Sequence, residues 1–338
     1  MASKIYDAGA PSLYPDHSTL CDAFRSSKRD GGGADPSYRP LKTWLERFAR
    51  GANLCLSVHH LTELARWRDR ETANTMAQWY DELPIVWAKS TQTIEQEESD
   101  HWTKVAAGVP SAGVRPFSST LMGAFHVLTP EATATLLGRQ DQAFALLDLA
   151  RNIGHLKQER FIAHTAEWFR ADLSWADENG LSFDKRRERE AENEARALRE
   201  LARESDQRLT ERRDTAYARR SCSRGQVQDL LVELFHDEPK AMPYFRVQRC
   251  LWPGFRSRAQ RQRPGSKNEH DALSGALEDH LHASVGAAYC DLFTCDGDIA
   301  EWLAGIRPIL GRRPQMTARK HVGGSEGFVW DLMATWSP

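Results

Sequence analysis

Four acidic residues that are far apart in the sequence lie either directly after an expected strand or within an expected helix that is connected to one. Asp16 directly follows a short apolar stretch, and Glu63 lies in the first turns of a helix expected after a second apolar run. Asp279 lies in a helix that leads into the last clear strand, and Asp296 directly follows that strand. In an open parallel sheet, carboxyl ends of strands and starts of adjoining helices meet at one crevice. We therefore expect the four carboxylates to share a pocket.

Carboxylates that gather in one place need a counter-charge. Two unit charges about 4 Å apart repel by about 4 kcal/mol at an effective dielectric near 20. A divalent cation removes this repulsion, and an all-oxygen ligand set suits Mg²⁺ or Mn²⁺ rather than Zn²⁺. Such an ion keeps bound waters and accepts phosphate oxygens, which favours phosphodiester hydrolysis. Asp298 competes with Asp296 for the fourth position, because both follow the same strand.

The elements that must position these acids have an α/β pattern. Short apolar runs of strand length lie at 12–14, 54–58, 84–87 and 291–295. Helices are expected at 19–27, over about 20 residues that include Leu61 to Arg68, at 273–288 and at 299–310, with a loop at 31–40. The alternation of strands and helices predicts parallel crossovers.

The middle of the chain has a different pattern. Apolar residues at spacings of three and four predict helix over 129–173. The charged stretch 184–220 carries a narrow apolar stripe that includes Leu198 and Leu209. The stripe fits a long solvent-exposed helix with internal Glu–Arg pairs, or a coiled coil through which two copies of the chain form a dimer.

A basic segment follows at 240–267. It contains no acidic residue, and its Pro-Gly pairs at 253–254 and 264–265 predict a loop. Cations neutralise phosphates and aromatic rings stack on unpaired bases, so the segment is a candidate RNA-binding surface. The residues that would contact RNA are Arg246, Arg249, Trp252, Phe255, Arg256, Arg258, Arg261 and Arg263. In the alternative interpretation, Trp252 and Phe255 belong to the core.

Three segments together resemble the PIN-domain ribonuclease superfamily. They are YPDHS around Asp16, LSVHHLTELARW around Glu63, and DHLHASVGAAYCDLFTCD, which begins at Asp279 and ends at Asp296. The resemblance covers roughly residues 10–95 and 268–300. It implies an α/β fold with a PIN-like parallel sheet flanked by helices, here split by a long, mostly α-helical insertion. His17 departs from the family, which has a small residue there, and typical members are far shorter.

The resemblance also implies roles and a domain organisation. Asp16, Glu63, Asp279 and Asp296 would hold Mg²⁺ or Mn²⁺, supported by Ser18, Asp291 and Thr294. The two halves of the core would be residues 1–100 and 268–338, separated by the helical insertion at 101–239 and the basic segment at 240–267. His282 is interpreted as a packed or hydrogen-bonded histidine rather than a catalytic base, and the pair His59-His60 as strand-to-helix packing rather than a metal-binding pair.

Composition limits the function classes. The chain has 338 residues, of which 41% are hydrophobic, and a formal net charge of −2, so it has enough apolar material for a core and is not a basic nucleic-acid coat. No apolar run is long enough for a membrane span, the first residues lack a signal-peptide pattern, and the six cysteines contain no CxxC pair. These features predict a cytoplasmic protein with reduced thiols.

The expected function is a metal-dependent endoribonuclease that acts on an RNA substrate. A PIN-like RNA-binding or protein-interaction module without catalysis is the alternative, and a DNA-directed nuclease is less favoured because no helix-hairpin-helix pattern is evident. A homo-oligomer through the charged helix is a further expectation. An antitoxin-like regulator is compatible with the resemblance but has no signature in the sequence.

Overall fold

The computed structural model describes residues 4–27, 36–65, 69–120, 124, 241–261, 269–303, 315–317 and 325–334. The helix expected over 129–173 and the apolar stripe of 184–220 lie outside these residues. The coiled-coil dimer therefore stays a prediction from the sequence.

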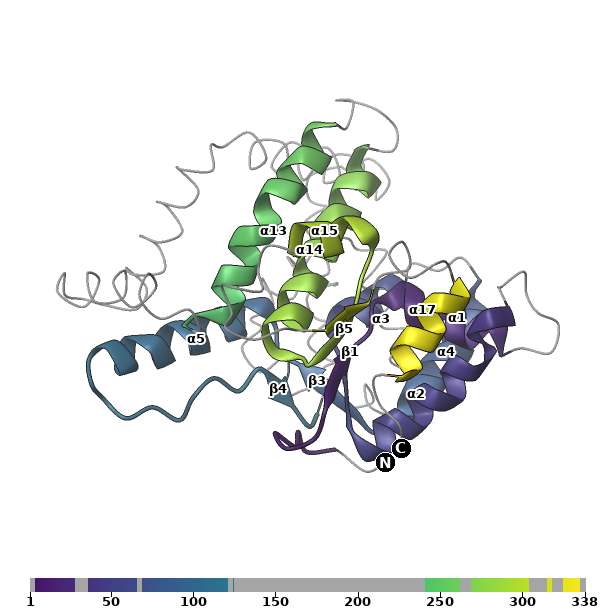
Figure 1. Cartoon of the computed structure of the whole chain (residues 1–338), viewed down its shortest axis with the longest axis horizontal. Coiled ribbons are helices and arrows are strands. Elements are labelled where there is room, and N and C mark those ends of the chain that lie inside the picture. The colour runs from purple at the N-terminus through teal and green to yellow at the C-terminus, as the bar shows by residue number, and fades with distance from the viewer. Residues whose placement is uncertain are drawn as a thin grey trace, which may run out of the picture.

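The described part of the chain is an α/β fold built on a mixed sheet of six strands (Figure 1). The strands are β1 (Ser12–Tyr14), β2 (Asn53–Leu56), β3 (Ile85–Ala88), β4 (Phe117–Ser118), β5 (Leu292–Thr294) and β6 (Gln315–Thr317). Their order is β4-β3-β2-β1-β5-β6, and every neighbouring pair is parallel except β3 and β4. The chain builds β2 and β3 on one side of β1 and then β5 and β6 on the other. The strand order therefore reverses between β1 and β5, where an open sheet forms a crevice.

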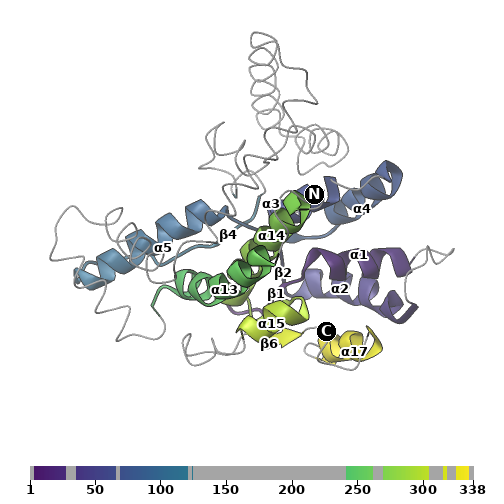
Figure 2. The same cartoon turned by 90° about the horizontal axis from the view of Figure 1, so that it is seen from above.

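Helices cover both faces of this sheet (Figure 2). Residues of α1 (His17–Ser26), α2 (Arg39–Gly51), α3 (Val58–Ala65), α4 (Arg70–Glu82) and α17 (Ser325–Ala334) pack in one core cluster. Residues of α5 (Thr91–Ala106), α13 (Pro243–Gln260), α14 (Glu269–Tyr289) and α15 (Gly297–Leu303) pack in the other. Successive strand residues alternate between the clusters: Leu13 faces the first and Tyr14 the second. Burial on both faces explains why these strands have continuous apolar sequences.

Two expectations for local structure are corrected. The single helix expected after β2 is interrupted: α3 ends at Ala65, and Asp69 begins α4 by accepting a 3.1 Å hydrogen bond from the backbone N–H of Thr72. The loop expected at 31–40 ends earlier, in a 3₁₀ turn (Pro36–Tyr38), because α2 already begins at Arg39. Pro40 fits the first turn of α2, where a backbone N–H has no partner within the helix.

The loop expected at 240–267 is wrong for most of its length. Residues 243–260 form α13, with Pro253 inside it. A side chain in place of Gly254 would overlap the ring of Trp302 on α15, so this glycine permits close helix packing and does not mark a turn. Residues 262–268, which include Arg263 and the second Pro-Gly pair, lie outside the described residues.

In the described part of the chain, no helix combines the length and the apolar character that crossing a membrane requires.

Candidate metal and phosphate site

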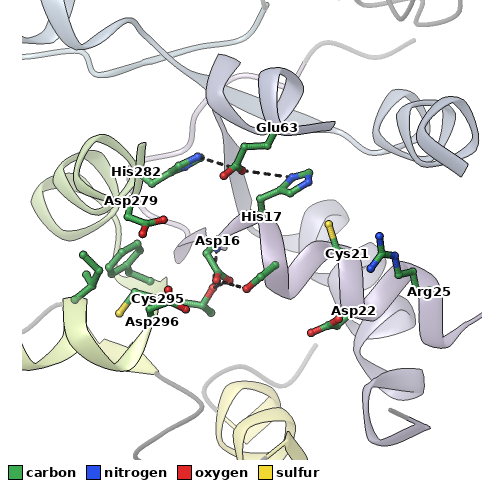
Figure 3. Close-up of a pocket in the computed structure, with 14 residues that line it drawn as sticks. Asp16, His17, Cys21, Asp22, Arg25, Glu63, Asp279, His282, Cys295 and Asp296 are labelled. Carbon is green, nitrogen blue, oxygen red and sulfur yellow. Dashed lines mark hydrogen bonds and ion pairs between the residues drawn. The ribbon is translucent and has the colours of Figure 1, made fainter. Parts of the chain in front are cut away.

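One pocket at the carboxyl ends of β1 and β5 contains all four predicted acids. Asp16, Glu63, Asp279 and Asp296 line a cavity of about 350 Å³ (Figure 3). They come from the β1–α1 junction, α3, α14 and the β5–α15 junction, so four separate elements contribute. The pocket lies where the strand order reverses. The topology thus brings these residues together as the parallel-sheet argument predicts.

Asp16 is the N-cap of α1, and both of its carboxylate oxygens accept hydrogen bonds. Its Oδ1 accepts a 3.1 Å bond from the backbone N–H of Thr19 and a 2.8 Å bond from the hydroxyl of Thr294. Its Oδ2 accepts a 2.5 Å bond from the hydroxyl of Ser18. The backbone N–H of Asp16 donates to Thr294 Oγ1 at 2.7 Å, which ties the end of β1 to the end of β5. The carboxylate is therefore fixed toward the pocket, and the N-terminus of α1 favours its negative charge.

Ser18 and Thr294 thus contact the acid that the resemblance assigns them to support. Asp291 does not lie in the pocket. It precedes β5, at the opposite end of the strand, where its Oδ2 accepts bonds of 2.9 Å and 2.7 Å from the backbone N–H and hydroxyl of Ser12. Asp291 therefore connects the start of β5 to the start of β1 and does not contribute to the pocket.

Asp279 pairs with an arginine from α13. Nη1 of Arg258 donates to Oδ2 of Asp279 at 2.6 Å, and both side chains are partly exposed. The pKa of Asp279 is raised to about 7. Burial is the largest cause, the negative charges of Asp296 and Glu63 act in the same direction, and Arg258 opposes them. Three of the four acids therefore interact electrostatically, which is the repulsion expected for carboxylates in one pocket.

Glu63 lies between two histidines. Its Oε2 is 3.5 Å from Nε2 of His282 and 3.7 Å from Nδ1 of His17 (Figure 3). Both rings also line the pocket. His17, which departs from the family pattern, therefore takes part in the site. His282 proves to be packed and hydrogen-bonded, and it also contacts an acid of the site.

The pocket distinguishes the two candidates for the fourth acid. Asp296 is a lining residue, whereas Asp298 lies in the first turn of α15 and outside the lining. A carboxylate in the first turn stabilises a helix through its dipole. Asp298 therefore has a structural explanation, and Asp296 is the better candidate.

The two cysteines of the pocket do not fit nucleophilic chemistry. Burial raises the pKa of Cys295 far above its ordinary value, and the charges of Asp16, Asp296 and Asp279 raise it further. Burial also raises the pKa of Cys21. Both thiols therefore keep their protons at neutral pH, whereas a reactive cysteine needs an accessible thiolate.

The predicted RNA-binding residues separate into two groups. Trp252 and Phe255 are buried, at 5% and 0% exposure, so the interpretation as core residues is correct and stacking on bases is excluded for these rings. Arg246 is also buried, and its Nε donates to the carbonyl of Ala241 at 2.5 Å. Arg249 and Arg261 are exposed, and Arg258 reaches the pocket through Asp279. The side chain of Arg256 and all of Arg263 lie outside what the structure describes.

Residues that the sequence interpretation missed complete the lining. Asp22 and Arg25 both line the pocket from α1, and Arg25 is exposed. They lie four and seven residues after Ser18, which also lines the pocket, so the three share one face of α1. This spacing was a usable signal once a helix was expected to begin after Asp16.

The oxygen atoms of the pocket suit a hard divalent cation, but they do not converge on a single point where such an ion would bind. Carboxylate oxygens and a threonine hydroxyl are ligands that Mg²⁺ and Mn²⁺ accept. In the described residues, no group of three or more histidine, cysteine or acidic side chains converges tightly enough to hold a metal ion. The residues fit the ion in chemistry and in charge, and side-chain rotation would have to bring the oxygens together.

Comparison of this chain with protein-family models, with curated proteins and with solved structures finds no match. Its interpretation therefore depends on the pocket itself and on the resemblance of the three segments.

Proposed function

We propose that the protein is a metal-dependent endoribonuclease with a PIN-like core. The observation that carries this proposal is that Asp16, Glu63, Asp279 and Asp296 line one pocket at the ends of the parallel strands β1 and β5, where the strand order of the mixed sheet reverses. The sheet, flanked on both faces by helices, agrees with what the resemblance implies for the fold. Cysteine chemistry is disfavoured because the two thiols of the pocket keep their protons.

Asp16, Glu63, Asp279 and Asp296 would hold one or two Mg²⁺ or Mn²⁺ ions. When bound, such an ion polarises the phosphodiester and lowers the pKa of a bound water. Asp16 is preoriented for this role by Thr294 and by the start of α1. Glu63, held between two histidines, would orient a water for in-line attack. By the usual chemistry of the family, the products would carry 5′-phosphate and 3′-hydroxyl ends.

Arginines on either side of the acids would bind the RNA backbone. Arg25 lines the pocket from α1, and Arg258 reaches Asp279 from α13. An arginine fork suits phosphate oxygens, which would otherwise be repelled by the acids. Arg249 lies exposed on α13, the helix that carries Arg258, and the exposed Arg261 directly follows the end of this helix. Both would extend the contact along the RNA strand.

The test compares RNA cleavage by the wild type with that by Asp16→Asn and Asp279→Asn, in Mg²⁺ or Mn²⁺. We expect at least a 100-fold loss in each variant, with unchanged circular dichroism. Asp7→Asn is a matched control, because Asp7 lies in the turn before β1 and outside the pocket. Wild-type rates in both pocket variants would refute the proposal.

A binding module without catalysis is the second candidate. The observation that favours it is the Arg258–Asp279 pair, which already neutralises one acid. This candidate predicts RNA binding that is unchanged by EDTA, and no cleavage as Mn²⁺ is added. Metal-dependent cleavage that is lost in Asp16→Asn would exclude it.

A further inference from the structure

A buried hydrogen-bonded network lies behind the pocket. It consists of Tyr14, Ser57, His60 and His282, of which none is more than 5% exposed. Tyr14 Oη is 2.7 Å from Ser57 Oγ and 2.8 Å from His282 Nδ1. The ring of His60 packs edge-on against that of His282, with centroids 4.6 Å apart. Buried polar groups in such a network are costly unless each is satisfied, so their arrangement is strongly specified.

The proton positions on His60 follow from its partners. Its Nδ1 accepts a 3.0 Å bond from the backbone N–H of Ser57, which can only donate. Its Nε2 lies 2.8 Å from the carbonyl oxygen of Pro15, which can only accept. His60 is therefore neutral and protonated on Nε2. Burial lowers its pKa to about 3, so this state holds across the physiological range.

The direction of the Tyr14 hydrogen bond follows in turn. Nε2 of His282 faces a carboxylate oxygen of Glu63 at 3.5 Å, and a carboxylate only accepts. A proton on Nε2 makes this contact attractive, whereas a lone pair there would be repelled. If Nε2 carries the ring's single proton, Nδ1 of His282 is an acceptor, and its 2.8 Å contact with Tyr14 is a bond donated by the tyrosine hydroxyl. The hydroxyl of Ser57 then donates to Tyr14.

The network contacts the three segments that carry Asp16, Glu63 and Asp279. Pro15, the partner of His60, directly precedes Asp16. His60 lies three residues before Glu63 on α3.

His282 completes these connections from α14, three residues after Asp279. One set of buried bonds therefore fixes β1, α3 and α14 relative to one another at the base of the pocket.

We propose that Tyr14 is a positioning residue of the site, which orients His282 so that its Nε2–H holds the carboxylate of Glu63. This inference rests on the proposed function, because it assigns Glu63 a role as a ligand. Tyr14 does not line the pocket and acts through His282. Groups that contact a metal ligand directly, as His282 contacts Glu63, typically change metal affinity by about 10- to 100-fold when they are lost. Tyr14 lies one contact further out, so its loss should fall at the lower end of this range.

The test removes only the hydroxyl, in Tyr14→Phe, and measures Mn²⁺ affinity by calorimetry beside the melting temperature. We expect Mn²⁺ binding to weaken by about 10-fold or more. We also expect kcat for RNA cleavage to fall while KM stays within about twofold. Unchanged Mn²⁺ affinity in a folded Tyr14→Phe protein would overturn the positioning role.

Two other tyrosines supply matched controls. Tyr289 donates a 2.9 Å bond to the buried carboxylate of Glu98, so Tyr289→Phe removes a comparable bond outside the pocket. The buried hydroxyl of Tyr80 bonds to none of the described residues, so Tyr80→Phe removes a hydroxyl without a bond. Both controls should keep wild-type Mn²⁺ affinity. A loss in Tyr289→Phe as large as in Tyr14→Phe would show a general effect of destabilisation and would contradict the proposal.

A measurement without metal separates this inference from the proposed function. In ¹⁵N-histidine spectra of the wild type we expect His60 and His282 to be protonated on Nε2, and Tyr14→Phe to change the tautomer of His282 alone. An unchanged His282 tautomer would overturn the inference. Absence of both Mn²⁺ binding and cleavage in the wild type would instead overturn the proposed function.

If Tyr14→Phe does not fold, His282→Asn tests the same contact. Asparagine keeps a polar atom near the position of Nδ1 for Tyr14 but is too short to reach Glu63. We expect Mn²⁺ affinity to fall by about 10-fold or more, and wild-type affinity in this variant would contradict the proposal.

Discussion

At the scale of single residues, the two acids after β5 have different tasks although only Gly297 separates them. Asp296 lines the pocket and raises the pKa of Asp279, whereas Asp298 lies in the first turn of α15. We expect Asp296→Asn to reduce RNA cleavage at least 100-fold. Asp298→Asn should keep activity within about twofold and lose less than about 1 kcal/mol of stability, through a weaker interaction with the helix dipole. Rates measured at saturating Mn²⁺ check this, and the reverse order of effects would move the fourth ligand to Asp298.

The sequence was informative about individual acids because each follows or precedes a short apolar strand. It could not reveal the partners that those acids acquire in three dimensions. Arg258 was recognised as a cation but not as the partner of Asp279, since the two are joined only when α13 packs beside α14. His17 was noted as a departure from a pattern, and only the folded chain places it against Glu63.

At the scale of elements, α14 must approach β5 closely to bring Asp279 near Asp296. Gly286 permits this approach, because a side chain at that position would overlap the ring of Phe293. We expect Gly286→Ala to lower the free energy of unfolding by about 1–3 kcal/mol through overpacking, and to reduce cleavage by displacing Asp279. Urea unfolding measures the first effect. Gly9→Ala is the control, because its new methyl group would meet only a side chain at ordinary contact distance. It should change the free energy of unfolding by a few tenths of a kcal/mol. Equal effects of the two substitutions would contradict the argument.

The helix α13 shows why an element can be misjudged from its sequence. The Pro-Gly pair at 253–254 favours a turn, and this local signal outweighed the apolar positions Tyr244, Val247 and Leu251, which recur at helical spacing. Burial of these residues against α14 and the sheet stabilises the helix despite the proline. Tertiary packing thus overrides local preference, and the apolar spacing was the better guide.

A buried carboxylate also fastens α13 to α5. Glu98 accepts bonds of 2.9 Å and 3.0 Å from the backbone N–H groups of Tyr244 and Phe245, in the first turn of α13. Burial raises its pKa to about 7, although these bonds and the Tyr289 hydroxyl act in the opposite direction.

This pKa shift predicts a pH-dependent stability. Between about pH 4.5 and 7 the folded protein retains a proton on Glu98 that the unfolded chain has lost, so stability falls as the pH rises. We expect Glu98→Gln to remove this component, which is worth about 3 kcal/mol at most. Urea unfolding at pH 5 and 7.5 measures it. Glu97→Gln, at a neighbouring carboxylate paired with Lys89 at the surface, is the control, and parallel pH profiles of wild type and Glu98→Gln would contradict the assignment.

At the scale of the whole molecule, the framework followed from the sequence and the accessory elements did not. Strands β1, β2, β3 and β5 have continuous apolar sequences because both faces of the sheet are covered, and such runs are readable. The two outer strands, β4 and β6, have the sequences Phe-Ser and Gln-Met-Thr, so each contains a single apolar residue and gives no apolar run to recognise. The order of the strands, which creates the pocket, depends on pairing between distant segments that no local signal encodes.

The pocket gathers negative charge at the centre of this framework, so a bound cation should stabilise the entire fold. Mn²⁺ at 100 times its dissociation constant should add about 2.7 kcal/mol, which corresponds to a rise of about 4 °C in melting temperature for a chain of 338 residues. Calorimetric melting of the wild type with Mn²⁺, and again after EDTA, measures the effect. Potassium chloride at matched ionic strength is the control for screening, which weakens repulsion between exposed charges without occupying a site. Asp16→Asn and Asp296→Asn should each lose most of the increase, because they remove ligands and repulsion together. The prediction is contradicted if potassium chloride raises the melting temperature as much as Mn²⁺ does, or if Mn²⁺ raises it equally in the two variants. Either result would mean that general screening of charge repulsion stabilises the protein, without a specific site for a divalent ion.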